Sequence, residues 1–130
     1  MKLLAYEVDK RSFLGVLNED ETWVYPVSAA GMEYRSMKDL IREAGPSEME
    51  MLDYISKKAP GDVVGAAPVD EIRVVSPIAE PDQDIICLGI NYMDHAEESA
   101  RFEKRAFEKP EKAIYFSKRV NRTNDPDGII

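Results

Sequence analysis

Short apolar runs separated by polar tetrads occupy the first part of the chain. The runs cover residues 2–8, 13–17 and 22–25, and the tetrads between them are Asp9-Lys10-Arg11-Ser12 and Asn18-Glu19-Asp20-Glu21. Apolar runs of this length with turn residues between them are typical of strands joined as hairpins. The pattern therefore predicts a small antiparallel sheet near the N-terminus.

The spacing of the apolar positions then changes to that of two helices. The first predicted helix follows Ser36, a candidate N-cap, and stops at Gly45-Pro46. The second starts at Ser47, where Glu50 three residues later fits a capping box. Residues 69–75 predict one further strand, which completes an N-terminal domain over residues 1–77.

Prolines then mark a soft domain boundary, and residues 78–130 show a second group of elements. Residues 85–88 form a continuous apolar run, which predicts a strand buried on both faces. A charged helix to about Phe107 and a short strand at 113–116 are predicted to follow. The fold class predicted for the whole chain is α+β.

Composition and charge narrow the possible partners. The 130 residues are 44% hydrophobic and carry a net charge of −8, with scattered basic residues. Nucleic acid is an unexpected partner, because phosphate contacts need clustered Lys and Arg. The single cysteine, Cys87, cannot form an internal disulfide and is predicted to be a small buried hydrophobe. No signal peptide or membrane-spanning run is apparent, so the cytoplasm is the expected location.

The residue types best suited to catalysis lie after the apolar run. His95 is the only histidine, and Glu98 three residues later would share its helical face. A carboxylate beside an imidazole can fix its tautomer or move a proton with it. An ordinary pair on a helix surface fits the same spacing. Asp125 and Asp127 could contact a cation, but the turn composition around Pro126 favours a solvated loop.

Residues 89–98, Gly89-Ile90-Asn91-Tyr92-Met93-Asp94-His95-Ala96-Glu97-Glu98, resemble the Gly-x-Asn-Tyr-x-x-His-x-x-Glu motif of the fumarylacetoacetate hydrolase family. Residues 76–78 and 84–88 resemble the approach to that motif. Lys109-Pro110 with residues 114–118 resembles the family's Pro-x-x-x-x-Phe-x-Lys stretch, although Arg119 stands where a proline often follows. The resemblance covers the last third to half of the chain, and the first 75 residues resemble the family's variable N-terminal domain only weakly.

This resemblance implies an enzyme that cleaves or rearranges carbon–carbon bonds next to carbonyl groups in small 2-oxo or β-diketo acids. Magnesium or manganese would act as the Lewis acid. His95 and Glu98 would activate a water or move a proton, and Lys118 would stabilise negative charge on the substrate. Asn91 and Tyr92 would bind the substrate. Alternatively, Lys118 is an ordinary surface lysine, and Asn91 and Tyr92 serve only the turn.

In the family a Glu-x-Glu pair and a later Asp hold the metal, and the resemblance places them after residue 130. Residues 78–130 are therefore expected to be the start of an incomplete catalytic domain, with no metal bound by this chain alone. Unpaired sheet edges there would favour a homo-oligomer. Three interpretations follow: an inactive N-terminal part of an enzyme, a non-catalytic module that pairs with itself or a full-length relative, or a short enzyme that completes its site with a partner chain.

Overall fold

The N-terminal residues form the antiparallel sheet that the sequence predicts. In the computed structural model, which describes residues 1–89 and 112–129, this sheet has five strands in the order β4-β3-β2-β1-β5. The strands are β1 (Leu3–Val8), β2 (Arg11–Leu17), β3 (Trp23–Pro26), β4 (Ala67–Pro68) and β5 (Arg73–Val75). Every neighbouring pair is antiparallel. The first three strands lie where the apolar runs predict them.

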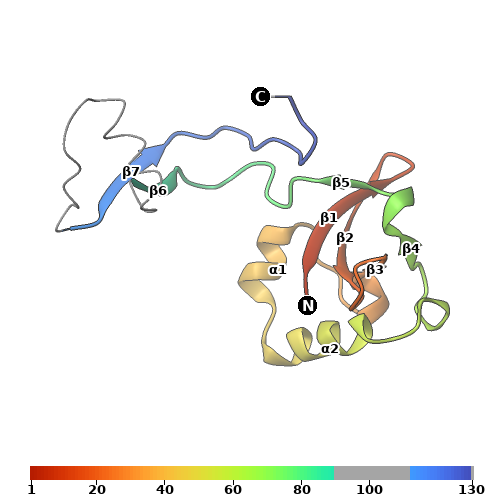
Figure 1. The fold of residues 1–130 in the computed structure, drawn as a ribbon. Coiled ribbons are helices and arrows are strands. Elements are labelled where there is room, and N and C mark those ends of the chain that lie inside the picture. The colour runs from red at the N-terminus through yellow and green to blue at the C-terminus, as the bar shows by residue number, and fades with distance from the viewer. Residues whose placement is uncertain (90–111, 130) are drawn as a thin grey trace. The chain divides into compact units, whose positions relative to one another are not determined.

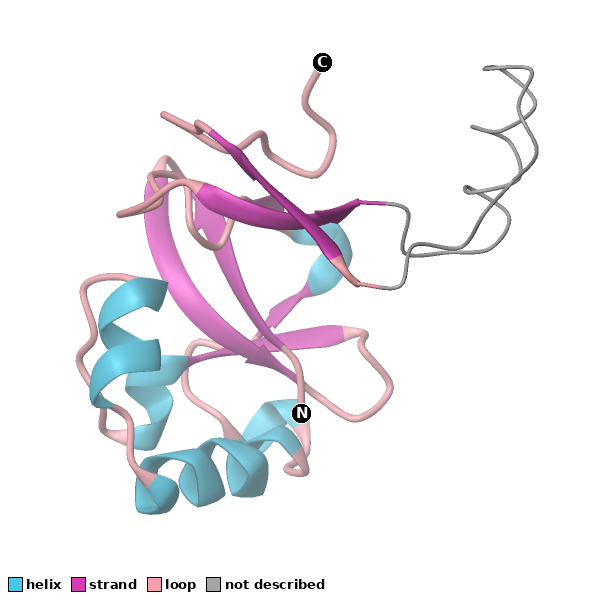
Figure 2. Cartoon of the chain, turned by 90° about the vertical axis from the view of Figure 1, so that its left-hand side faces the viewer, coloured by secondary structure: helices cyan, strands magenta, loops and turns pink. Residues whose placement is uncertain are grey.

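Two helices pack on one side of this curled sheet (Figure 2). They are α1 (Met37–Glu43) and α2 (Pro46–Ser56), and short 3-10 turns follow β3, α2 and β4 at Val27–Ala30, Pro60–Asp62 and Val69–Glu71. The described residues are therefore of the α+β class, as predicted, and they contain more strand than helix. No helix among the described residues is long and apolar enough to cross a membrane.

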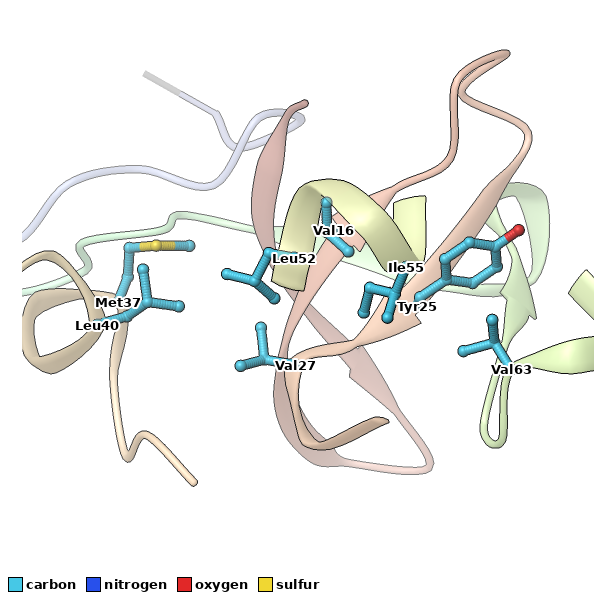
Figure 3. Close-up of a cluster of buried hydrophobic side chains, with 8 residues drawn as sticks. All are labelled: Val16, Tyr25, Val27, Met37, Leu40, Leu52, Ile55 and Val63. Atoms are coloured by element: carbon cyan, nitrogen blue, oxygen red, sulfur yellow. The ribbon is translucent and has the colours of Figure 1, made fainter. Parts of the chain in front are cut away.

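The main core lies between the two helices and the sheet (Figure 3). Its members are all buried and come from β2, β3, both helices and the turns: Val16, Tyr25, Val27, Met37, Leu40, Leu52, Ile55 and Val63. Tyr25 satisfies its hydroxyl by donating to the Lys58 carbonyl at 2.7 Å. The adjacent Val24 points to the opposite face, where it packs with Leu4 and Tyr6 in a second cluster. The curl thus allows both faces of the sheet to be buried.

The two helix starts show one correct and one incorrect prediction. Ser36 caps α1, because its hydroxyl accepts from the Asp39 amide at 3.2 Å. The capping box from Ser47 to Glu50 is wrong. Instead α2 begins at Pro46, and the Glu48 carboxylate accepts from the Gly45 amide at 3.1 Å. A proline suits the first helical position because its missing N–H would have no intrahelical partner there.

The strand predicted over residues 69–75 is correct only in its second half. Val69–Glu71 forms a 3-10 turn, and β5 begins at Arg73. Asp70 and Glu71 have low strand propensity, and the Val69 amide is satisfied by the Thr22 carbonyl at 2.9 Å. A short turn therefore replaces the first half of the predicted strand.

The turn between β1 and β2 has an unusual backbone, which gives a stability prediction. Asp9 and Lys10 have φ values of 50° and 64°, as in a two-residue type I′ turn, where the second position favours glycine. Lys10→Gly should therefore raise the free energy of unfolding by about 0.5–1 kcal/mol. Urea denaturation would measure the change, and Lys10→Ala, which keeps a Cβ, is the control without this gain. A loss of stability in Lys10→Gly would contradict the assigned turn.

Residues Glu80–Arg122 form a compact unit separate from Met1–Ala79 and Thr123–Ile130. Its described part is one antiparallel pair, β6 (Ile85–Gly89) with β7 (Ile114–Lys118) (Figure 1). Within the described residues no further strand joins this pair. The division into domains at residues 1–77 and 78–130 stays a prediction.

The predicted burial of residues 85–88 on both faces is wrong. Ile86 is 74% exposed on one face, and Ile85 is 40% exposed on the other. Cys87 is only partly buried, rather than fully buried as predicted. An apolar run is buried on both faces only where other elements cover it, and a two-stranded pair cannot provide that cover itself.

Candidate functional site

The candidate site residues divide into two groups. His95, Glu98, Asn91 and Tyr92 lie outside the described residues, so their roles stay predictions. Lys118 is described and is the last residue of β7, where its Cα partner in β6 is Ile85. The strand pair is therefore the framework from which the candidate site can be built.

The strand pair follows directly from its side chains. β6 is rich in isoleucine and leucine, and β7 carries isoleucine, tyrosine and phenylalanine, which suit strands. Opposed residues lie on the same face, so Leu88 with Tyr115 and Cys87 with Phe116 are cross-strand pairs on alternate faces. These contacts hold the two segments in register although 24 residues, 90–113, separate them in the sequence.

Gly89, the first residue of the motif, ends β6 opposite Ile114. A Cβ placed on Gly89 would lie 3.5 Å from the nearest Ile114 side-chain atom, which is an ordinary van der Waals distance. The pairing of β6 with β7 therefore does not itself require a glycine here. Gly15 in β2 is different, because a Cβ there would overlap Val24 and lie 2.8 Å from the Tyr6 ring.

Lys118 and the motif leave the strand pair at opposite ends. Lys118 lies opposite Ile85, whereas the chain continues toward Asn91 from Gly89. The four residue steps from Ile85 to Gly89 correspond to about 13 Å along a strand. The residues after Gly89 can therefore act with Lys118 on one small substrate only if the chain turns back along the pair.

Lys118 is exposed, and it contacts an aromatic ring on its own strand. Its Nζ lies 5.9 Å from the centroid of the Phe116 ring, near the outer limit for a cation–π contact. Residues two apart in a strand share a face, so this contact follows from local geometry. Both interpretations of Lys118, as substrate ligand and as surface lysine, fit this environment.

The described residues do not fit the metal ion that the resemblance implies. Nowhere in residues 1–89 and 112–129 do three or more His, Cys, Asp or Glu side chains gather in a way that could hold an ion. Asp125 lies in a loop, as predicted, but its carboxylate is not simply solvated, because it accepts from Arg73 at 2.6 Å and from the Ser76 amide at 2.9 Å. Asp127 is exposed, as the solvated-loop interpretation predicts.

A hollow of about 130 Å³ near the N-terminus is occupied by ion pairs rather than by free functional groups. Lys2 pairs with Glu21 at 2.5 Å, and Lys57 pairs with Asp53 at 2.6 Å, one turn away on α2. The hydrogen bond from Lys57 lowers the pKa of the Asp53 carboxyl, and the same bond raises the pKa of the Lys57 ammonium. Exposed ion pairs of this kind modestly stabilise a helix, and they do not indicate a catalytic or binding role.

Comparisons with protein families and with curated proteins found no match to the chain. The likeness to the fumarylacetoacetate hydrolase family therefore rests on the order and spacing of the residues at 76–98 and 109–118.

Proposed function

We propose that the chain is the N-terminal part of a metal-dependent enzyme similar to fumarylacetoacetate hydrolase. Such an enzyme acts on carbon–carbon bonds or tautomers of small 2-oxo or β-diketo acids. The observation that carries the proposal is that the two stretches with the family's pattern are paired strands. β6, residues 85–89, leads into the motif, and β7, residues 114–118, contains the family lysine. The two strands are hydrogen-bonded neighbours.

In this proposal each functional residue has one task. His95 and Glu98 activate a water or move a proton, and Lys118 stabilises the negative charge that develops on the substrate. Asn91 and Tyr92 bind the substrate. The resemblance assigns magnesium or manganese to the carboxylates that follow in the family, and residues 1–130 alone are expected to be inactive.

The exposed apolar side chains of the strand pair support the proposal that the pair belongs to a larger domain. Ile86, Leu88 and Tyr115 share one face and are 74%, 47% and 66% exposed. An isolated two-stranded pair is only marginally stable in water, and it gains stability when further strands or another layer cover its apolar face. The missing strands of a catalytic domain would provide such a cover.

Mass and turnover of the protein purified from its natural source test the proposal together. A mass well above 14.7 kDa, with acylpyruvate hydrolysis or oxaloacetate decarboxylation that requires Mg²⁺ or Mn²⁺, is the expected result. Removal of the metal with a chelator should abolish turnover, and its return should restore it. A mass of 14.7 kDa without turnover on either substrate class would overturn the proposal.

A second candidate function, self-association through β6 and β7, is favoured by the same exposed face. Unpaired strand edges beside apolar side chains are prone to pairing with another chain. The chain of 130 residues should therefore sediment faster as its concentration rises. The double variant Ile86→Lys/Tyr115→Lys should remain a monomer, because it places two charges on that face.

Tyr54→Lys is the matched control for this second function. Tyr54 is 59% exposed, similar to Tyr115, but it lies on α2 in the other compact unit. The control should self-associate like the unmodified chain. Monomeric behaviour of the unmodified chain over the full concentration range would exclude this second function.

A further inference from the structure

The chain returns to the N-terminal unit immediately after residues Glu80–Arg122. The Thr123 amide donates to the Ala79 carbonyl at 2.8 Å. The Thr123 hydroxyl donates to the Ile78 carbonyl at 2.7 Å and lies 2.5 Å from the Ser76 hydroxyl oxygen. The residues that directly precede and follow the second unit are thus hydrogen-bonded to each other.

Asp125 provides a second, charged attachment at the same place. One carboxylate oxygen accepts from the Ser76 amide at 2.9 Å, and the other accepts from the Arg73 guanidinium at 2.6 Å. The same guanidinium donates to Glu7 of β1 at 2.9 Å. Arg73 therefore links the returning segment to both edge strand β5 and its neighbour β1.

The two bonds of Asp125 differ in their surroundings. The Arg73 side chain is 63% exposed and the Asp125 side chain is 27% exposed, so solvent screens this ion pair, whereas the bond from the Ser76 amide is part-buried. Hydrogen bonds between charged groups, and from a backbone amide to a carboxylate, are among the stronger kinds. Asp125 accepts both kinds at once, and it joins residues that lie 49 and 52 positions away in the sequence.

Short stretches of chain connect the attachment to the strand pair of the second unit. Ile85 and Lys118 are the partners at the open end of β6 and β7. Only residues 80–84 on one side and 119–122 on the other connect this end to Ala79 and Thr123. When Ala79 and Thr123 are held together, the pairing of Ile85 with Lys118 closes only the short connections at residues 80–84 and 119–122. Without that restraint, the strands can pair only by closing the longer segment at residues 90–113, which costs more conformational entropy.

We propose that Arg73, Ser76, Thr123 and Asp125 form a latch that promotes the pairing of β6 with β7. The latch holds both ends of residues 80–122 together, and short connections convey that restraint to the strands. The latch itself does not depend on the proposed function. If that function holds, the latch also positions the strands that carry Lys118 and lead into the motif, and this extension rests on the proposed function.

Hydrogen exchange of the β6 and β7 amides in the whole chain tests the latch. Asp125→Asn and Thr123→Val should each speed exchange at residues 85–89 and 114–118 by about fivefold, the factor expected when a short loop becomes a long one. Asp127→Asn is the matched control, because it makes the same chemical change two residues away at an exposed position. It should leave these rates unchanged.

The core amides of β2 are the control for unfolding of the N-terminal unit. Their exchange should stay at the unmodified rate in Asp125→Asn, which shows that the N-terminal unit remains folded. Equal exchange at β6 and β7 in the unmodified chain, Asp125→Asn and Thr123→Val would overturn the proposal. Because the readout is hydrogen exchange, a latch that fails is distinguishable from an enzyme function that fails.

A disulfide can replace the latch in a second experiment. The double variant Ser76→Cys/Thr123→Cys, in a Cys87→Ser background, should form a disulfide, because the two side chains already meet. The oxidised form should protect β6 and β7 at least as well as the unmodified chain and should no longer respond to Asp125→Asn. Reduction should restore that response. The same response to Asp125→Asn before and after reduction would contradict the latch.

Discussion

Replacing Leu52 with alanine is expected to lower the free energy of unfolding of the N-terminal unit by about 3 kcal/mol. Leu52 is fully buried, and it extends from α2 into the core that includes Val16 and Val27 (Figure 3). Removal of its side chain both loses buried apolar area and leaves a cavity among β-branched neighbours that have little freedom to fill it. Urea denaturation followed by fluorescence would measure the loss.

The chain offers a suitable probe and control for this measurement. Trp23 is the only tryptophan and lies in β3, so its fluorescence reports on the N-terminal unit. Met51→Ala is the matched control, because Met51 precedes Leu52 on the same helix but is 45% exposed. It should cost less than 1 kcal/mol by the usual range for surface positions. Equal losses in both variants would contradict the assigned core.

Elements governed by local patterns were predictable from the sequence. The strands β1, β2 and β3 follow from short apolar runs bounded by turn residues, and the N-cap of α1 follows from Ser36. The start predicted for α2 is wrong because two local signals compete there. Pro46 at the first helical position, together with the Glu48 bond to the Gly45 amide, outweighs the spacing of Ser47 and Glu50.

Features that depend on distant contacts could not be predicted in this way. The partners of Asp125 lie about fifty residues away, and its turn-like neighbours indicate only a loop. The apolar run of β6 indicates a strand, but its burial depends on what covers it. Likewise, the motif gives the order of Gly89 and Lys118 in the chain, whereas the strand register decides that they lie at opposite ends of the pair.

In the proposed enzyme, His95→Ala and Glu98→Ala are each expected to lower kcat by about 10²- to 10⁴-fold, the usual contribution of a positioned proton-transfer group. KM and the affinity for Mn²⁺ should change little, because neither residue is assigned to the metal. Steady-state kinetics with saturating metal would measure kcat and KM separately, and a metal titration would measure the affinity.

Glu97→Ala is the matched control for this pair of variants. It removes the same carboxylate one position earlier, where a helical arrangement would direct it away from the face shared by residues 95 and 98. Loss of kcat in His95→Ala and Glu98→Ala with normal turnover in Glu97→Ala would assign the proton-transfer role to the pair. Unmodified turnover in both His95→Ala and Glu98→Ala would contradict the proton-transfer role. The two residues would then be an ordinary pair on a helix surface, and another group would have to move the proton.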